Sequence, residues 1–365
     1  MELEIVSFIH SNPDWEQKLS DSPYFIKTKR GDGFVLLKYD QLNSDFGLPL
    51  VRECRGIILD EEDSFRPVCI PFFKFGNFGE SYVPQINWAT ARVQEKIDGS
   101  LIKLWHCRGK WHVSSNGEID AQNAGISSAL LTGARMTNLY ALFTEAWDKT
   151  GLSMESLDKG FTYMFELTSP HNRIVVRYND VAIRHIGTRD NCTLLECELD
   201  IGVAKPAVFP LRTLDECMES AKKLGYDDEG FVIVDRLYNR IKVKSPLYVA
   251  LNHMVQGTTT HGNIVEIIQR NEQGEFLSYF PEFNDVFSKI SQCISDFATR
   301  QDALFAELNT KHFDSRKSLA EVVTKTECPA CLFALVDGKA ADARSWLISR
   351  PADKILALIG LEKAN

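Results

Sequence analysis

The sequence lacks a long hydrophobic run and an export signal. Its 365 residues include no stretch of about 18 uninterrupted apolar residues, which is the length needed to span a bilayer. The opening segment MELEIVSFIHSNPDWEQKLS has neither a basic start nor a long apolar core, which are the marks of a secretory signal. The sequence therefore predicts a soluble, cytoplasmic protein with no membrane partner.

A disulfide framework is also missing. The chain has 9 cysteines, an odd count, and they are scattered along it, which favours reduced thiols. Only Cys328 and Cys331, in the segment CPAC, are closely spaced. No second pair stands at zinc-finger spacing, so packed free thiols are favoured over a metal clip, and the metal alternative stays open.

Positive charge is scarce. Lys and Arg number 41 against 50 Asp and Glu, which gives a net charge of −9. This balance argues against a protein that coats nucleic acid through bulk electrostatic attraction, but it does not exclude a local basic groove. Basic residues do gather at 173–177, 184–189 and 236–244. A polyanionic partner is expected to meet those segments.

The sequence contains no internal repeat, no low-complexity segment and no P-loop. The P-loop pattern Gly-x-x-x-x-Gly-Lys-Ser/Thr, which cradles nucleotide phosphates in Walker-type enzymes, is absent. Walker-type nucleotide hydrolysis is therefore disfavoured.

The first part of the chain reads as strands. Single hydrophobic cores rarely exceed ~250–300 residues, so a chain of 365 residues favours two domains. Residues 1–250 are rich in short β-branched or aromatic runs bounded by Gly, Asn or Asp, with helical stretches at 128–148 and 214–224. The mixture predicts an α+β domain of antiparallel sheets, with strands at 93–96, 101–106, 111–114, 162–167, 174–178, 231–235 and 240–244.

After about residue 250 the pattern becomes helical. Apolar residues from Phe283 to Leu308 recur at spacings of four and three, with one gap at Gln301, as on one face of an amphipathic helix. Further helices are predicted at 315–324 and 354–361. Residues 251–365 are therefore predicted to form a smaller all-α domain.

Charged residues recur inside strand-like segments, where structure alone would favour apolar side chains. One is the lysine of VQEKIDGSLIKLWH, residues 93–106, which stands two places before an Asp-Gly turn. The tetrapeptide Lys-x-Asp-Gly is weak evidence by itself. The charged residues follow in this order: Arg55 in ECRG, Lys74 in FFKFGNF, Lys96 in KIDG, Glu166 in YMFEL, Glu229 in DEGFVIV, and Lys242 and Lys244 in RIKVK.

These residue types suit nucleotide phosphoryl chemistry. Several lysines and an arginine can converge on a polyphosphate, and two carboxylates can hold a hard divalent cation that bridges phosphate oxygens. Lys242 and Lys244 are expected on one face of a strand, because side chains alternate with a period of two.

The ordered set resembles the covalent nucleotidyltransferase superfamily of ATP-dependent ligases and mRNA capping enzymes. Lys96–Gly99 is similar to its nucleotidyl-accepting motif. Phe165-Glu166, Glu229–Val232 and Lys242–Lys244 are similar to its third, fourth and fifth motifs. Over about residues 50–250 the sequence is most similar to RNA ligases of the bacteriophage T4 RNA ligase 1 type. The segments ECRG, KFGNFGE, NRIV, TRDN and KVKS carry this resemblance in order.

The resemblance implies a fold and a reaction. It implies a nucleotidyltransferase (adenylation) domain at 1–250 and a helical domain at 251–365 that bears on substrate choice. It implies that Lys96 attacks ATP to form a lysyl-AMP, that AMP then passes to the 5′-phosphate of RNA, and that a 3′-hydroxyl finally seals the break, as in RNA repair. A monomer in the cytoplasm, or in the cytoplasm of a phage-infected host, is the favoured state.

Site roles follow from the same resemblance. Lys96 is the expected nucleophile. The nucleotide is expected to contact Arg55, Lys74, Glu95, Glu166, Lys242 and Lys244. Mg²⁺ or Mn²⁺ is expected at Glu166 and Glu229, because carboxylate and phosphate oxygens suit both ions. Arg173 and Arg189 are the residues expected to bind the RNA end, and the alternative that they merely flank strands stays open.

Several alternatives stay open. Lys74 can be a surface lysine over an aromatic patch, Arg55 a packed arginine, and Glu229 part of a solvated acidic turn. The segment SSNGE at 114–118 departs from the basic or hydroxyl-rich turn of related ligases. A DNA ligase or capping-type enzyme is the alternative activity, although these usually append an OB-fold, whereas residues after 250 read as helical. A non-catalytic nucleotide-binding or RNA-end-binding protein is the third possibility.

Overall fold

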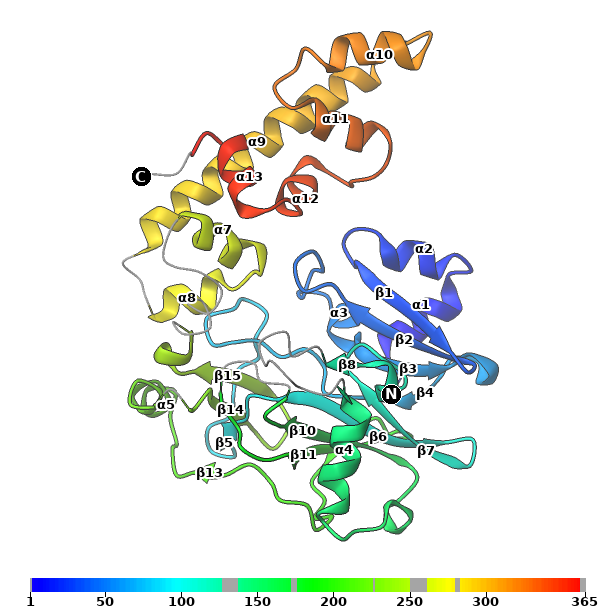
Figure 1. Ribbon diagram of the computed structural model, residues 1–365, viewed down its shortest axis with the longest axis vertical. Helices are drawn as coiled ribbons and strands as arrows, with labels where there is room; N and C mark the ends of the chain where they lie inside the picture. Colours follow the sequence, from blue (N-terminus) through cyan, green and yellow to red (C-terminus); the bar gives the residue numbers. More distant parts are fainter. Residues whose placement is uncertain are drawn as a thin grey trace. The chain divides into compact units, whose positions relative to one another are not determined.

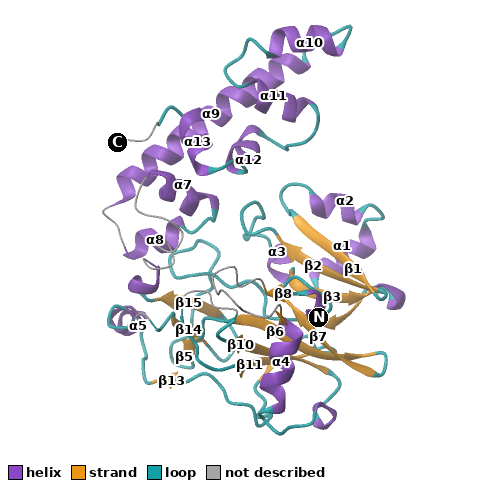
Figure 2. Cartoon of the chain, viewed as in Figure 1, coloured by secondary structure: helices purple, strands orange, loops and turns teal. Residues whose placement is uncertain are grey.

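The computed structural model describes residues 2–126, 137–171, 176–225, 227–249, 261–279 and 283–361. The chain divides into two compact units, the first made of residues 1–40 and 44–252 and the second of residues 41–43 and 253–365. Strands and helices build the first unit, and helices build the second (Figures 1 and 2). The predicted α+β class with antiparallel sheets is confirmed for the strand-rich part of the chain.

The first sheet of the strand-rich unit has the order β1-β2-β3-β4, and every pair is antiparallel. One face packs against helices α1 (Glu4–Ser11) and α2 (Trp15–Ser20), and Val35, Leu37 and Ile57 belong to that core. The other face carries Phe34 and Leu36 against Trp105 of the next sheet. Its strands are β1 (Ile26–Gly31), β2 (Phe34–Tyr39), β3 (Arg55–Asp60) and β4 (Arg66–Cys69).

The second sheet has the order β12-β11-β10-β6-β7. Helix α4 covers it through Phe143 and Trp147, which contact the ring of Phe165. Its strands are β6 (Ser100–Cys107), β7 (Lys110–Ser115), β10 (Phe161–Thr168), β11 (Ala182–Asp190) and β12 (Glu196–Cys197).

The third sheet has the order β13-β5-β14-β15 and packs on α5 through Cys217 and Ala221. Its strands are β5 (Arg92–Lys96), β13 (Val208–Phe209), β14 (Gly230–Val234) and β15 (Arg240–Lys244), and a separate pair is formed by β8 (Gly125–Ile126) and β9 (Thr137–Asn138). The helices of this unit are α1 (Glu4–Ser11), α2 (Trp15–Ser20), α3 (Pro49–Glu53), α4 (Leu139–Asp148) and α5 (Leu214–Ala221), with single 3₁₀ turns at Glu61–Asp63, Ala121–Asn123 and Met154–Ser156.

In the helical unit, α9 is the longest helix. It buries the predicted apolar stripe, including Phe287, Ile294 and Phe297. Gln301, the gap in that stripe, is fully buried and donates to the Glu327 carboxylate at 3.2 Å. The helices are α7 (His261–Gln269), α8 (Gln273–Tyr279), α9 (Asn284–Asn309), α10 (Arg316–Val323), α11 (Pro329–Val336), α12 (Ala343–Ile348) and α13 (Ala352–Leu358).

None of the helices in the described ranges is long and apolar enough to cross a membrane. Cys328 and Cys331 are both buried free thiols, at the start and in the first turn of α11. Of the 9 cysteines, Cys192 alone is exposed.

Two predicted elements need correction. The helix predicted at 128–148 begins at Leu139, because Asn138 caps it by accepting a hydrogen bond from the Ala141 N–H at 2.8 Å, and residues 128–136 lie outside the described residues. The strand predicted at 174–178 is wrong for residues 176–178, which form no strand. There the Val176 N–H donates to the Asp98 carboxylate at 2.8 Å, so this segment bonds to a turn, and residues 174–175 lie outside the described residues.

Candidate active site

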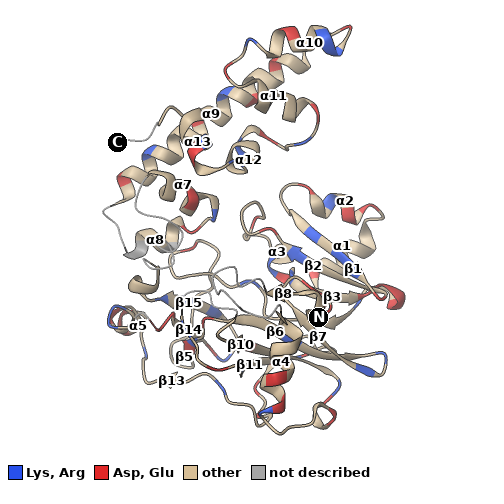
Figure 3. Cartoon of the chain, in the orientation of Figure 1, with Lys and Arg blue, Asp and Glu red and all other residues tan. Residues whose placement is uncertain are grey.

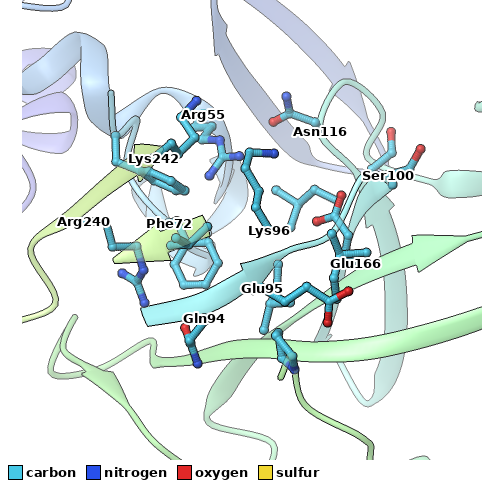
Figure 4. Close-up of a pocket in the computed structure, with 18 of the residues that line it drawn as sticks. Arg55, Phe72, Gln94, Glu95, Lys96, Ser100, Asn116, Glu166, Arg240 and Lys242 are labelled. Carbon is cyan, nitrogen blue, oxygen red and sulfur yellow. The ribbon is translucent and has the colours of Figure 1, made fainter. Parts of the chain in front are cut away.

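A cavity of about 450 Å³ opens where the three large sheets of the first unit converge. This volume lies within the range of small-molecule sites. Residues from the second and third sheets line most of it, and Arg55 of β3 completes one wall (Figure 4). Charged and polar residues on its walls include Arg55, Gln94, Glu95, Lys96, Ser100, Ser115, Asn116, Glu166, Arg240 and Lys242.

Lys96 is the last residue of β5 and stands directly opposite Gly230, the first residue of β14. This pairing brings the residue before Gly230 to the lysine, and the Lys96 ammonium forms an ion pair with the Glu229 carboxylate. The side chains are 18% and 5% exposed, respectively. The alternative that Glu229 belongs to a solvated acidic turn is therefore wrong, because its side chain is buried. Gly230 has φ +143°, and a Cβ there would clash with the backbone of Val243, so this pairing needs glycine.

The turn after Lys96 is fixed by its aspartate. Asp98 is 5% exposed, and its carboxylate accepts hydrogen bonds from the Val176 N–H at 2.8 Å and the Tyr248 hydroxyl at 2.9 Å. A Cβ on Gly99 would lie 2.5 Å from the Leu167 carbonyl oxygen, so the close approach of this turn to β10 also needs glycine. The aspartate therefore acts by hydrogen bonding to partners beyond its own turn.

Glu166 and Glu229 provide the carboxylates of the site. Burial is the main cause that raises the pKa of Glu166 to about 7, the Lys96 ammonium opposes the rise, and the Glu229 carboxylate adds to it. Glu166 lines the cavity, and Glu229 is bonded to Lys96, which lines it too. Carboxylates on both sides of the lysine would suit a hard divalent cation. In the described part of the chain no group of three or more His, Cys, Asp or Glu side chains gathers as a metal site, so the nucleotide itself would have to supply further oxygen ligands.

Arg55 and Lys242 approach the cavity from β3 and β15, and both contact one aromatic ring. The guanidinium carbon of Arg55 lies 5.2 Å from the Phe75 ring centre, and the Lys242 nitrogen lies 5.4 Å from it. Figure 4 shows both side chains together with Lys96 at the cavity. The ring holds two cations near each other, which suits a ligand with several negative charges.

Other predicted residues lie away from the cavity walls. The Lys74 nitrogen stacks over Phe46 at 4.7 Å and Tyr39 at 5.5 Å, and Lys244 lies 5.8 Å from the Tyr248 ring. Arg189 is buried and forms an ion pair with Glu196 at 2.7 Å. Arg173 lies outside the described residues.

Arg240 lines the cavity but was not predicted from the sequence as a site residue. Its guanidinium lies 4.1 Å from the Phe72 ring centre and pairs with Glu196 at 2.6 Å, so one carboxylate serves both Arg240 and Arg189. The signal that could have found it is strand alternation, since Arg240 and Lys242 are two residues apart on β15 and both line the cavity. Phe72, Phe75 and Asn116 were also not predicted as cavity residues.

A partly buried lysine bonded to one carboxylate, with a second carboxylate and several cations lining the same cavity of antiparallel sheets, defines the class as the covalent nucleotidyltransferases. A family model described as RNA ligase matches residues 53–248, which contain every described residue of the cavity. The chain belongs to this RNA ligase family.

The chain is also similar to individual proteins of known sequence or structure. A protein of Autographa californica nuclear polyhedrosis virus, described as a bifunctional polynucleotide kinase/RNA ligase, is 30% identical over 72% of this chain, and the match spans 39% of its own length. An RNA ligase of Rhodothermus phage RM378 is 26% identical over 82% of this chain and 80% of its own. Among solved structures, an archaeal ATP-dependent RNA ligase aligns at 12% identity with a TM-score of 0.46, covering 76% of this chain and 74% of its own.

Proposed function

We propose that the protein is an ATP-dependent RNA ligase that joins 5′-phosphate and 3′-hydroxyl RNA ends through a lysyl-AMP at Lys96. The observation that carries the proposal is the position of Lys96. It is a partly buried lysine, bonded to Glu229, at the wall of a cavity that Glu166, Arg55 and Lys242 also line. Such a surrounding serves a nucleophile that must bind and cleave a polyphosphate.

Three phosphoryl transfers make up the proposed reaction. In the first, the neutral amine of Lys96 forms a bond to the α-phosphorus of ATP, and the bond to the β-phosphate oxygen breaks, so pyrophosphate leaves. In the second, an oxygen of the RNA 5′-phosphate takes AMP from the lysine. In the third, the 3′-hydroxyl oxygen attacks the activated 5′-phosphorus and AMP leaves. Each transfer depends on positioning and charge neutralisation.

The residues of the cavity divide these tasks. Arg55 and Lys242 neutralise phosphate oxygens, and Lys74 and Lys244, although they lie off the cavity walls, remain proposed contacts for a bound nucleotide. Glu166 and Glu229 would hold Mg²⁺ or Mn²⁺, which supplies further neutralisation of phosphate charge. Asp98 holds the turn that presents the lysine. Arg189 stays a proposed residue for the RNA end, although its guanidinium is buried and paired with Glu196.

An intact-mass measurement tests the proposal. The wild-type protein and Lys96→Ala are incubated with ATP and Mg²⁺, denatured and weighed. We expect one added AMP on the wild type and none on the variant. A protein purified already adenylated would lose AMP on treatment with pyrophosphate. If the wild type neither gains AMP nor loses it to pyrophosphate, the proposed function is wrong.

The acceptor is then identified by offering 5′-phosphorylated RNA and DNA to the adenylated protein. Sealing of RNA is expected. DNA ligases and capping enzymes usually append an OB-fold, a five-stranded barrel, whereas the described residues of 261–361 are built from helices and their connections. Exclusive transfer to DNA, or to a diphosphate RNA end, would favour those enzymes instead.

A further inference from the structure

Lys38 lies in a row of cations that crosses the first sheet. It stands on β2 directly opposite Lys27 of β1 on one side and Arg55 of β3 on the other. Like charges opposite each other in a sheet destabilise it. Figure 3 shows basic segments on the strands of this part of the chain. The row begins at an exposed edge, where Lys27 is 72% exposed, and ends at the cavity wall with Arg55.

Among the lysines of this part of the sheet, Lys38 differs from Lys27 and Lys29, which both have carboxylate partners. Lys27 pairs with Asp40 at 2.7 Å, and the neighbouring Lys29 pairs with Glu118. Lys38 is half-buried, and among the described residues its side chain makes no hydrogen bond and no ion pair. Burial is the main cause that lowers its pKa; Lys27 and Lys29 lower it further, and Glu118 and Asp40 act against them. A partly buried cation without a partner costs free energy unless an anion binds to it.

The position of this ammonium is next to the cavity. Its nitrogen lies 3.3 Å from where a Cβ of Gly117 would stand, and Gly117 and Asn116 line the cavity together with Arg55. The Nη1 atom of Arg55 is also buried without a hydrogen-bond partner. Lys38 therefore lies directly behind a stretch of wall that contains Gly117, and Arg55, its cross-strand neighbour, lines the same cavity with a nitrogen of unmet bonding capacity.

We propose that Lys38 is a phosphate-binding residue of this cavity, acting with Arg55 on the oxygens of a terminal phosphate. The inference rests on the proposed function. A phosphate carries enough negative charge to relieve the repulsion along the row, and its several oxygens can accept from both donors at once. The phosphate belongs either to the triphosphate tail of ATP or to the 5′ end of RNA, which present the same chemistry.

Two kinetic arms distinguish these sources. The first measures the rate of AMP uptake against ATP concentration. The second starts from protein already adenylated and measures AMP transfer against the concentration of 5′-phosphorylated RNA. We expect Lys38→Met to raise the half-saturating concentration about tenfold in one of the two arms, which corresponds to about 1.4 kcal/mol. A rise in the first arm assigns Lys38 to ATP, and a rise in the second assigns it to the RNA end.

Two further variants serve as controls. Lys27→Met removes the cross-strand neighbour, which already has a carboxylate partner, and is expected to keep both half-saturating concentrations within about twofold of the wild type. Lys38→Arg keeps the charge and is expected to recover most of the loss. The melting temperature of the Lys38→Met protein should be no lower than that of the wild type. The substitution removes a charge that is repelled by Lys27 and Arg55 on the neighbouring strands.

Two results would overturn the inference. One is a Lys38→Met protein with wild-type half-saturation in both arms. The other is an equal fall of the maximal rates in both arms together with a lowered melting temperature, which would make Lys38 structural. Failure of the proposed function looks different, because the wild type itself would then take up no AMP.

Discussion

At the scale of single residues, the ion pair between Lys96 and Glu229 links stability to activity. Both side chains are largely removed from water, so deleting one leaves the other without its partner. We expect Lys96→Met and Glu229→Gln each to lower the free energy of unfolding, and the double variant to lose less than the sum of the two. The expected coupling is about 1–3 kcal/mol, measured by urea unfolding of the four proteins. Strictly additive losses would show that the pair contributes nothing.

Activity responds differently to the same two positions. Lys96→Met is expected to abolish AMP uptake, whereas Glu229→Gln is expected to slow it and to raise the Mg²⁺ concentration needed for half-maximal rate. The reason is that the variant keeps the nucleophile but loses a carboxylate oxygen for the cation. Titration of Mg²⁺ at saturating ATP measures the effect. An unchanged Mg²⁺ requirement would assign Glu229 to holding the lysine alone.

Phe75 offers a test of how the cations Arg55 and Lys242 are placed. Its ring contacts both Arg55 and Lys242, so Phe75→Leu should let both cations move and should weaken ATP binding about three- to tenfold, as expected for the loss of two cation–π contacts. Phe161→Leu is the matched control, since that partly buried ring packs on Tyr163. Equal ATP dependence in the two variants would contradict a positioning role for Phe75.

Many cavity residues could be predicted from the sequence, because they belong to short motifs that follow one another in a recognisable order. Arg55, Glu95, Lys96, Glu166 and Lys242 were singled out, and the structure brings them to one cavity, while their roles stay predictions. Lys38 could not be found this way, since its place depends on cross-strand register to Arg55. Phe75 was hidden for a related reason: only the folded chain shows that two distant cations share its ring.

At the scale of elements, helix α1 is capped by a residue far along the chain. The Glu53 carboxylate, at the end of α3, accepts hydrogen bonds from the Glu4 N–H at 3.1 Å and the Ile5 N–H at 2.9 Å. The helix has no side-chain cap of its own at Leu3. Burial is the main cause that raises the pKa of Glu53 from 4.5 to about 7, although these two hydrogen bonds oppose the rise.

The pH dependence of stability should report this carboxyl. Between pH 4.5 and about 7 the folded protein binds more protons at Glu53 than the unfolded chain does, so its contribution to stability falls as the pH rises through this window. Glu53→Gln removes the titration. We expect the wild type to lose stability relative to this variant across the window, by roughly 3 kcal/mol at most. A constant difference between the two proteins would refute the raised pKa.

Sequence patterns predicted elements best where local signals decide the conformation. The strand at 240–244 and the long helix α9 follow their alternation and their apolar stripe, and α10 begins after Ser315, which forms a capping box with Ser318. The segment 176–178 was misread as a strand because its β-branched and aromatic composition favours one, while its hydrogen bonds go to Asp98. The conformation of this segment depends on a tertiary contact with Asp98, which the local sequence does not reveal.

At the scale of the whole molecule, the chain divides into two units with different proposed tasks, AMP uptake in the first and substrate choice in the second. Every residue that lines the cavity belongs to the unit that ends at residue 252. A chain that ends there is expected to take up AMP at a rate within about threefold of the full chain, because its core clusters are its own. We expect it to seal RNA poorly, since residues 253–365 are proposed to contribute to substrate choice.

Intact-mass and sealing assays on the same preparation check this expectation. Loss of AMP uptake in a folded truncated chain would show that the helical unit takes part in the first transfer. Undiminished sealing would remove the proposed role of that unit. Circular dichroism of both chains serves as the control for folding.

The shared carboxylate of Glu196 has a consequence for how this family varies. It neutralises Arg189 and Arg240 together, and all three side chains are less than a tenth exposed. Loss of the Glu196 carboxylate alone would leave two buried guanidiniums without their ion-pair partner. Loss of one arginine would leave the Glu196 carboxylate with one of its two ion pairs. Substitution at any one of the three positions should therefore be tolerated only alongside change at the others, so that in an alignment of RNA ligases they are inherited as a covarying triplet.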